Sequence, residues 1–277
     1  MEIFSLLVLL ITAGAIAGLT AGLFGNGGGF AIVPALVFLF SVLEFQSENL
    51  IFVAIGTSLA CIIFSSTRAL LAHNKRGAVD FLILRAWAPW LIIGVIVGVI
   101  IASYTQANEL YLIFAWGVLF YGFYFLFPQI LDQVALKQRE MPSGIARAGL
   151  VSFLGGFSSL LGIAGGTITV ITMSVCKRPI YQAVATASGV GVIIGLVGTI
   201  GFFILGMNEP DLPYGSVGFV NLPATIIISL ISILTAPIGV KWAHSLEEQK
   251  LKRLFGLYLL LVSSGMFWKA NLSASII

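Results

Sequence analysis

Residues 18–37 read GLTAGLFGNGGGFAIVPALV. This stretch is apolar for nearly its whole length, yet residues 25–29 within it are Gly-Asn-Gly-Gly-Gly. Glycine adopts left-handed backbone conformations without strain, and a glycine inside a helix costs about 1 kcal/mol relative to alanine. The run therefore predicts a break between two helices in the middle of an apolar segment.

The composition of the chain is that of a membrane protein. Of its 277 residues, 59% are apolar and only 9% are charged, which leaves too little polar surface to cover a soluble core. Segments long enough to cross a hydrocarbon layer of about 30 Å recur throughout, and they predict an all-α polytopic membrane protein. The seven predicted spans are residues 3–24, 50–72, 81–103, 110–127, 182–206, 217–242 and 251–268, and three shorter apolar segments are 30–43, 144–161 and 167–176.

Basic and acidic residues alternate between successive loops. Lysine and arginine cluster within residues 68–85, 137–147, 177–178 and 241–253, whereas intervening loops such as MNEPDLPYGS at 207–216 are acidic or neutral. By the positive-inside rule the basic loops face the cytoplasm, and both termini lie on the extracytoplasmic side of a plasma (bacterial inner) membrane. The net charge of +3 reflects this orientation, so we expect the lipid bilayer as a partner and no nucleic acid.

This orientation requires two hairpins. The amino terminus and Glu44 both lie outside, so the chain between them must enter the membrane and return, turning near residues 25–29. Arg147 and Lys177 both lie inside, so the chain between them must also enter and return, this time from the cytoplasmic face. Its turn is expected at residues 162–166, Gly-Ile-Ala-Gly-Gly.

The two hairpins are related in sequence. Residues 18–33, GLTAGLFGNGGGFAIV, align with residues 155–170, GGFSSLLGIAGGTITV, so that the glycines of the two turns coincide. Each half of the chain then holds one hairpin and three spans, and this odd number of segments inverts the second half relative to the first. We predict two inverted-topology repeats, residues 1–131 and 145–277, joined by a cytoplasmic linker at 132–144.

Inverted repeats with interrupted helices at matching positions indicate a secondary transporter, because they bring two broken helices together near the bilayer midplane. Irregular backbone at that depth must be buried in protein or line a watery cavity. Each glycine turn also begins a new helix, and a helix amino terminus binds anions. We therefore expect a small anionic substrate held near the midplane by two opposed helix amino termini, with alternating access to the two faces.

The glycine pattern resembles that of a known family. Its residues are Gly18, Gly22, Gly25, Gly27, Gly28, Gly29 and Pro34, with Gly56-Thr57-Ser58 in the next predicted span. Together with the degenerate second copy, this pattern resembles the sulfite exporter TauE/SafE family of membrane transporters. The resemblance implies transport of small sulfur-containing anions, such as sulfite or organosulfonates like sulfoacetate. The second copy departs from the pattern at Ile163, Ala164 and Ile171, so the two halves are not expected to bind substrate equally.

Candidate anion ligands lie at and beside the two turns. Small residues let backbone donors approach a ligand closely, and several donors must converge because one helix terminus contributes only about 0.3–2 kcal/mol. The predicted substrate-binding residues are Gly25, Asn26, Gly27, Gly28, Gly29, Thr57, Ser58, Gly162, Gly165, Gly166, Thr167, Thr186 and Ser188. Arg68 and Arg85 are further candidate anion contacts, and the alternative for both is snorkelling toward the basic loop.

Structural alternatives stay open for these residues. Glycines in membrane helices often serve close packing, and mid-helix hydroxyls such as those of Thr57 and Ser58 often bond to preceding carbonyls. Small-residue faces could also support a homo-oligomer or packing within one chain; the residues concerned are Gly94, Gly98, Gly191 and Gly195.

Other functional classes are less consistent with the sequence. Two separated histidines and two lone cysteines supply neither a catalytic cluster nor a metal site, so we expect no enzyme, no metal and no cofactor. His73 is expected to be a solvated loop residue. No Asp or Glu lies deep within a predicted span, which favours a uniporter or a loosely coupled carrier driven by the membrane potential. An anion channel of the same architecture and a non-transporting membrane assembly or sensory protein remain the alternatives.

Overall fold

A computed structural model describes residues 2–43, 49–127, 141–243 and 248–274. Glu44 and most of the predicted linker at 132–144 lie outside these residues. The helices are α1 (Glu2–Phe24), α2 (Gly29–Val42), α3 (Leu50–Asn74), α4 (Phe81–Tyr104), α5 (Ala107–Leu126), α7 (Gly144–Leu160), α8 (Gly166–Val175), α9 (Ile180–Leu205), α10 (Leu222–Ala243) and α11 (Glu248–Ala274). Strands β1 (Ser216–Val217) and β2 (Val220–Asn221) form an antiparallel pair.

The helices confirm the prediction of an all-α polytopic membrane protein. Six of the helices that the structure describes are long and apolar enough to cross a membrane: α1 from Leu6, α3, α4, α5, α9 and α10. The predicted start of α10 at residue 217 was wrong by five residues, because the β1–β2 pair occupies residues 216–221.

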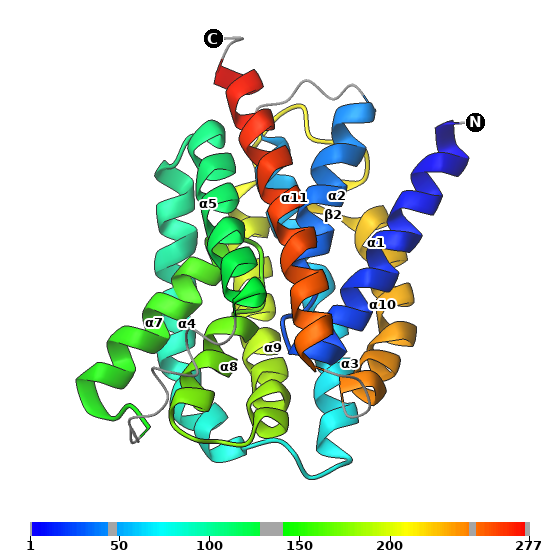
Figure 1. Cartoon of the computed structure of the whole chain (residues 1–277). Coiled ribbons are helices and arrows are strands. Elements are labelled where there is room, and N and C mark those ends of the chain that lie inside the picture. The colour runs from blue at the N-terminus through cyan, green and yellow to red at the C-terminus, as the bar shows by residue number, and fades with distance from the viewer. Residues whose placement is uncertain (1, 44–48, 128–140, 244–247, 275–277) are drawn as a thin grey trace.

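Helices α2 and α8 are too short to cross a bilayer. They contain 14 and 10 residues, which at about 1.5 Å per residue gives roughly 21 Å and 15 Å, against a hydrocarbon core of roughly 30 Å. Hairpin α1–α2 enters from the end of the molecule at which α11 ends, and hairpin α7–α8 enters from the opposite end (Figure 1). The two hairpins therefore meet inside the molecule.

The helices pack in pairs around the hairpins. Helix α1 packs on α10 and α7 packs on α4, while α3 packs on α9 and α5 packs on α11. Glycines allow the first two pairs to approach closely: a Cβ on Gly18 would lie 2.5 Å from Ser232 O, and a Cβ on Gly155 would lie 2.7 Å from Leu91 O. The small residues expected to serve either internal or intermolecular packing all contact other helices of the same chain: Gly94, Gly98, Gly191 and Gly195.

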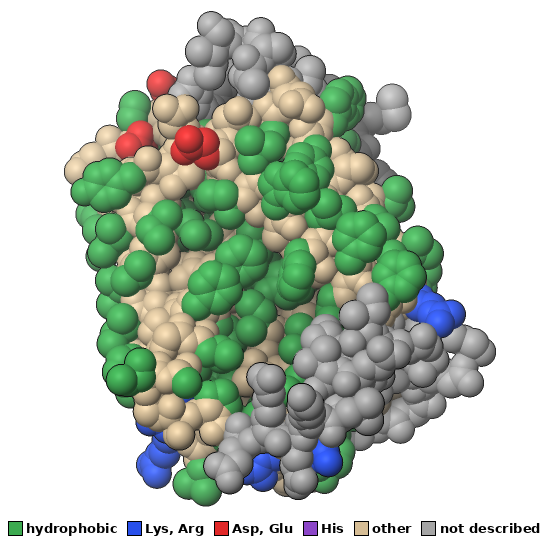
Figure 2. Space-filling view, turned by 60° about the vertical axis from the view of Figure 1, so that its left-hand side comes forward, with side chains coloured by type: hydrophobic (Ala, Val, Ile, Leu, Met, Phe, Trp, Pro, Cys, Tyr) green, Lys and Arg blue, Asp and Glu red, His purple; other side chains and the backbone are tan. Residues whose placement is uncertain are grey.

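The outer surface has the character of a membrane protein. Figure 2 shows hydrophobic side chains over the middle of one face, acidic side chains at one end, and Lys and Arg side chains at the other. Glu109, Glu209 and Asp211 are exposed in or beside the loops that follow α4 and α9, whereas Lys75 and Lys177 are exposed after α3 and α8. The polar ends and apolar middle match a slab of lipid.

Candidate functional site

Two glycine turns with left-handed residues at two matching positions lie at the centre of the molecule, and the first has a further one at Gly27. In the first glycine turn, residues 25–29, Gly25 and Gly28 have φ of 66° and 84°. In the second glycine turn, residues 162–166, Gly162 and Gly165 have φ of 62° and 66°. These left-handed conformations favour glycine and explain why it recurs at matching positions. Gly28 and Gly165 are then the N-cap residues of α2 and α8.

The two turns are in direct backbone contact. A Cβ on Gly29 would overlap the carbonyl oxygen of Gly162, and a Cβ on Gly166 would overlap the carbonyl oxygen of Gly25. Gly29 and Gly166 lie outside the left-handed region, so close approach, rather than backbone conformation, excludes a side chain at these two positions. The amino termini of α2 and α8 therefore begin beside each other.

Helix α3 holds both turns through their carbonyl groups. Ser58 Oγ donates to Gly162 O at 2.8 Å, and Ser65 Oγ donates to Gly27 O at 2.8 Å. The two serines are seven residues apart and so share one face of the helix. Both carbonyl oxygens are therefore engaged by α3. Ser65 was not predicted.

The amide groups at the start of both helices are available for a ligand. The first residues of a helix have no intrahelical acceptor for their N–H groups, and neither Gly28 nor Gly165 carries a side chain that could cap them. Asn26 Oδ1 accepts from Gly28 N at 3.2 Å, and this bond assigns the other side-chain atom, Nδ2, as the amino group. Asn26 Nδ2 has no partner among the described residues although the residue is only 1% exposed.

Three buried hydroxyls without a partner among the described residues adjoin the same turns: those of Thr167, Ser66 and Ser158. Thr167 follows Gly166 at the start of α8. A Cβ on Gly27 would lie 3.0 Å from Ser66 Oγ, and a Cβ on Gly165 would lie 2.9 Å from Ser158 Oγ. Ser66 and Ser158 were not predicted, since each is one of several serines in an apolar helix and no spacing distinguishes it.

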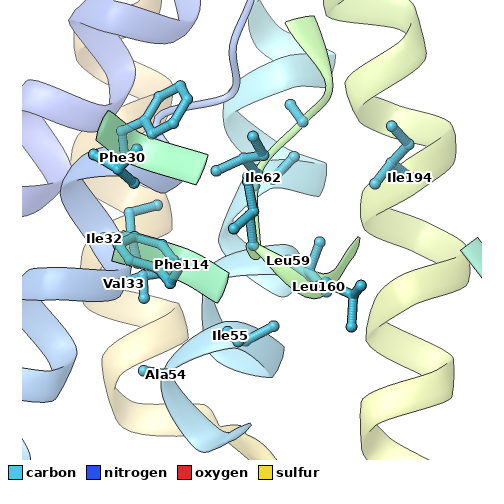
Figure 3. Close-up of a cluster of buried hydrophobic side chains, with 14 of the residues drawn as sticks. Phe30, Ile32, Val33, Ala54, Ile55, Leu59, Ile62, Phe114, Leu160 and Ile194 are labelled. Carbon is cyan, nitrogen blue, oxygen red and sulfur yellow. The ribbon is translucent and has the colours of Figure 1, made fainter. Parts of the chain in front are cut away.

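Apolar side chains surround this polar centre. Figure 3 shows Phe30 and Val33 of α2, Ile55 and Ile62 of α3, and Ile194 of α9, all members of one buried cluster. Unpaired buried polar groups are costly in such surroundings, about 1–3 kcal/mol each in proteins. Four such groups around one contact mark it as the place where a ligand would supply the missing partners.

Comparison with known proteins gives the family. The family model described as sulfite exporter TauE/SafE matches residues 10–266. The chain belongs to the sulfite exporter TauE/SafE family. No solved structure matches this TauE/SafE chain. Membership of a transporter family implies a transport role rather than an enzymatic one.

Curated relatives of the TauE/SafE chain carry general names. A probable membrane transporter protein of Haemophilus influenzae is 30% identical over 96% of this chain and 100% of its own length. A probable membrane transporter protein of Methanocaldococcus jannaschii is 26% identical over 94% of this chain and 97% of its own length. A third, from Bacillus subtilis, is 29% identical over 72% of this chain and 79% of its own length.

The other predicted hydroxyls of the TauE/SafE chain are engaged within the protein. Thr57 Oγ1 accepts from Asn221 N at 2.8 Å, and Thr186 Oγ1 accepts from Asp80 N at 3.0 Å. Asn221 and Asp80 accept backbone N–H bonds at the starts of α10 and α4, so both threonines fix a helix start. Their role as substrate contacts stays a prediction.

Ser188 is also bonded within its own helix, since its Oγ donates to Val184 O at 3.2 Å. The predicted alternative for mid-helix hydroxyls therefore describes Ser188, whereas Ser58 instead bonds across to the second glycine turn. Both residues lie beside the turns, because a Cβ on Gly25 would lie 3.4 Å from Ser188 N.

The arginines of the TauE/SafE chain lie outside this cluster. Arg68 is partly buried on α3, beyond Ser66, and Arg85 is exposed near the start of α4.

The expectation that His73 is a solvated loop residue was wrong: it is 1% exposed on the last turn of α3, with Nε2 3.3 Å from Gly22 O. No group of three His, Cys, Asp or Glu residues in the described part of the chain could hold a metal ion.

Proposed function

We propose that the protein is a secondary transporter of small sulfur-containing anions, such as sulfite or organosulfonates like sulfoacetate. The observation that carries the proposal is the contact between the two glycine turns, at which two helix amino termini and the amino group of Asn26 meet in an apolar interior. Donors of this kind, arranged around one point, bind an anion through hydrogen bonds.

The energetics require such a convergence. Moving an ion out of water costs tens of kcal/mol in an idealised apolar medium, and a charge-assisted hydrogen bond contributes about 1.5–3 kcal/mol. Backbone amides of Gly29 and Gly166, Asn26 Nδ2 and Thr167 Oγ1 together offer several such bonds from both turns. The two helix termini add a smaller term of about 0.3–2 kcal/mol each.

Alternating access follows from the proposed inverted repeats. In this proposal α1 corresponds to α7, α3 to α9, and α4 to α10. The helix packing supports it, because α1 packs on α10 just as α7 packs on α4. The threonine bonds support it as well, since Thr57 and Thr186 occupy matching positions and hold matching helix starts. Rocking of one repeat against the other would expose the turns to each face in alternation.

The proposed orientation places both termini and the acidic loops outside the cytoplasm, in a bacterial inner membrane. The separation of acidic and basic side chains between the two ends of the molecule supports it (Figure 2). The hairpin α1–α2 then descends from the extracytoplasmic face, and α7–α8 rises from the cytoplasmic face.

Counterflow in liposomes tests the function. Purified protein is reconstituted with unlabelled sulfite inside, and uptake of labelled sulfite is followed with sulfoacetate, taurine, sulfate, formate or chloride as competitor. We expect saturable exchange that sulfonates inhibit and chloride does not. Current steps of single open pores without saturable exchange would favour a channel of the same architecture, and no exchange with any sulfur oxyanion would refute the proposed substrate class.

A further inference from the structure

Ser66 and Ser158, like Thr167, are buried residues of the glycine-turn region whose hydroxyls have no hydrogen-bond partner among the described residues. They are 1% and 0% exposed, and they come from different helices, α3 and α7. Several other buried hydroxyls instead donate to a carbonyl one turn earlier, as those of Thr169 and Ser188 do. An unpaired buried hydroxyl destabilises the protein that contains it, so its presence at two points beside one site calls for a functional reason.

Both hydroxyls face the second glycine turn at successive residues. Ser66 Oγ lies close to Ala164 of the second turn. Both Ser66 Oγ and Ala164 Cβ would lie within 3.0 Å of a Cβ added to Gly27, and the same holds for a Cβ added to Gly191. Ser158 Oγ borders the next residue, Gly165. Successive Cα atoms are about 3.8 Å apart, so the two hydroxyls lie against neighbouring points of one turn.

Small residues surround the Ser66 hydroxyl, because larger ones at these positions would overlap it or its neighbours. Two glycines, Gly27 and Gly191, and the methyl group of Ala164 lie beside its hydroxyl, together with the Ile62 side chain. A Cβ on Gly191 would lie 2.6 Å from Ser66 Oγ, which is closer than side chains approach in folded proteins. The backbone of the first turn, the backbone of the second turn and α9 thus all converge on this one hydroxyl.

We propose that Ser66 and Ser158 are specificity-determining residues that donate hydrogen bonds to two oxygen atoms of one bound oxyanion. Each hydroxyl would donate one O–H···O bond of about 2.7–2.8 Å to its own oxygen of the anion. The inference rests on the proposed function for the place of the site, and it adds the ligand chemistry: an anion with at least two acceptor oxygens, such as a sulfonate or sulfite group. A single-centre anion such as chloride would offer both hydroxyls the same acceptor atom, whereas an oxyanion offers each its own oxygen.

The test compares three matched variants, Ser66→Ala, Ser158→Ala and Ser263→Ala. Ser263 is an equally buried serine whose Oγ donates to Ala115 O at 2.9 Å, so it controls for loss of a buried hydroxyl away from the turns. The melting temperature of each purified protein is measured alone and with sulfite, methanesulfonate, formate, nitrate, sulfate or chloride, and the anion that stabilises the wild type is titrated.

We expect Ser66→Ala and Ser158→Ala each to weaken binding of the stabilising oxyanion by about 10- to 100-fold, the loss of one charge-assisted hydrogen bond. Without anion, both variants should melt at or above the wild-type temperature, because an unpaired buried hydroxyl has been removed. Ser263→Ala should melt at a lower temperature and bind the anion normally. A purely structural role for Ser66 or Ser158 would lower the melting temperature and leave binding unchanged.

The outcomes separate this inference from the proposed function. If a sulfur oxyanion stabilises the wild type and both serine variants bind it normally, the inference is refuted and the proposed function stands. If only a sulfur-free oxyanion binds and both variants lose it, the inference holds and the proposed substrate class is wrong. If no oxyanion stabilises the wild type at any concentration tested, the inference is refuted.

Discussion

A single methyl group on Gly166 tests whether contact between the glycine turns serves transport. The backbone at Gly166 lies outside the left-handed region, so Gly166→Ala introduces no conformational strain of its own. The new Cβ would overlap Gly25 O and lie 2.7 Å from Asn26 Cα, and neither backbone atom can rotate away. The turns must separate by at least about 0.7 Å, which is the shift that restores 3.4 Å of ordinary contact to Asn26 Cα.

This separation has two expected costs. Overpacking of a tight interior lowers the free energy of unfolding by about 1–3 kcal/mol, which a protein of ordinary stability tolerates. Moving one set of donors by 0.7 Å relative to the other weakens at least one charge-assisted hydrogen bond to the anion, so kcat/KM for counterflow should fall about 10- to 100-fold. Both quantities are measurable on the same preparation, by denaturation in detergent and by exchange in liposomes.

Gly149→Ala is the matched control. Gly149 lies on α7, the helix that leads to the second glycine turn, and a Cβ there would meet nothing within 4 Å. Alanine should raise helix stability by up to about 1 kcal/mol and leave transport unchanged. Wild-type KM and flux in Gly166→Ala, or an equal loss in Gly149→Ala, would refute the argument that the turns act through their contact.

The remaining predictions concern topology, the threonines and the driving force. In a Cys176→Ser background with Cys61 buried, Asp211→Cys should react with an impermeant reagent from outside and Lys75→Cys should not; the reverse pattern would overturn the orientation. Thr57→Val removes the acceptor of Asn221 N and should lower the free energy of unfolding by about 1–3 kcal/mol without changing KM, whereas a raised KM at wild-type stability would make Thr57 a substrate ligand. A potential of 100 mV should drive a monovalent anion against about a fiftyfold gradient, and uphill flux driven by a pH gradient at zero potential would contradict uniport.

The sequence predicted the helices well because lipid imposes a simple pattern. Apolar length alone located α3, α4 and α9, since any span must satisfy its own backbone hydrogen bonds. The charge pattern predicted the two hairpins, and the short α2 and α8 follow glycine breaks as expected. The start of α10 was missed because two pairs of residues, 216–217 and 220–221, form a strand pair that apolar length does not reveal.

The candidate site was predictable in part. Glycines with left-handed φ have a local cause, so Gly25, Gly28 and their counterparts could be predicted from the two aligned glycine motifs. The hydrogen-bond partner of a buried hydroxyl depends on which helix faces pack together. Local sequence patterns do not show which faces these are. Thr57 and Thr186 thus hold helix starts, and Ser66 and Ser158, which no pattern distinguished, lie at the turns.

The burial of His73 has the same kind of cause. Its neighbours Lys75 and Arg76 are exposed, so the local sequence predicted a solvated side chain. In the fold, His73 lies on the face of α3 that packs against the end of α1, where Nε2 reaches Gly22 O. One turn of helix separates an exposed surface from the interior, and only tertiary packing decides which residues lie on each side.

The most direct test of the account is to locate the anion itself. Selenite is a close analogue of sulfite, and the selenium edge gives an anomalous signal that identifies its position without assumptions about the protein. Crystals of the wild-type protein soaked with selenite should show one anomalous peak at the contact of the two glycine turns, within hydrogen-bond distance of Asn26 Nδ2 and Thr167 Oγ1. A peak elsewhere in the helices, with none at the turns, would contradict the account.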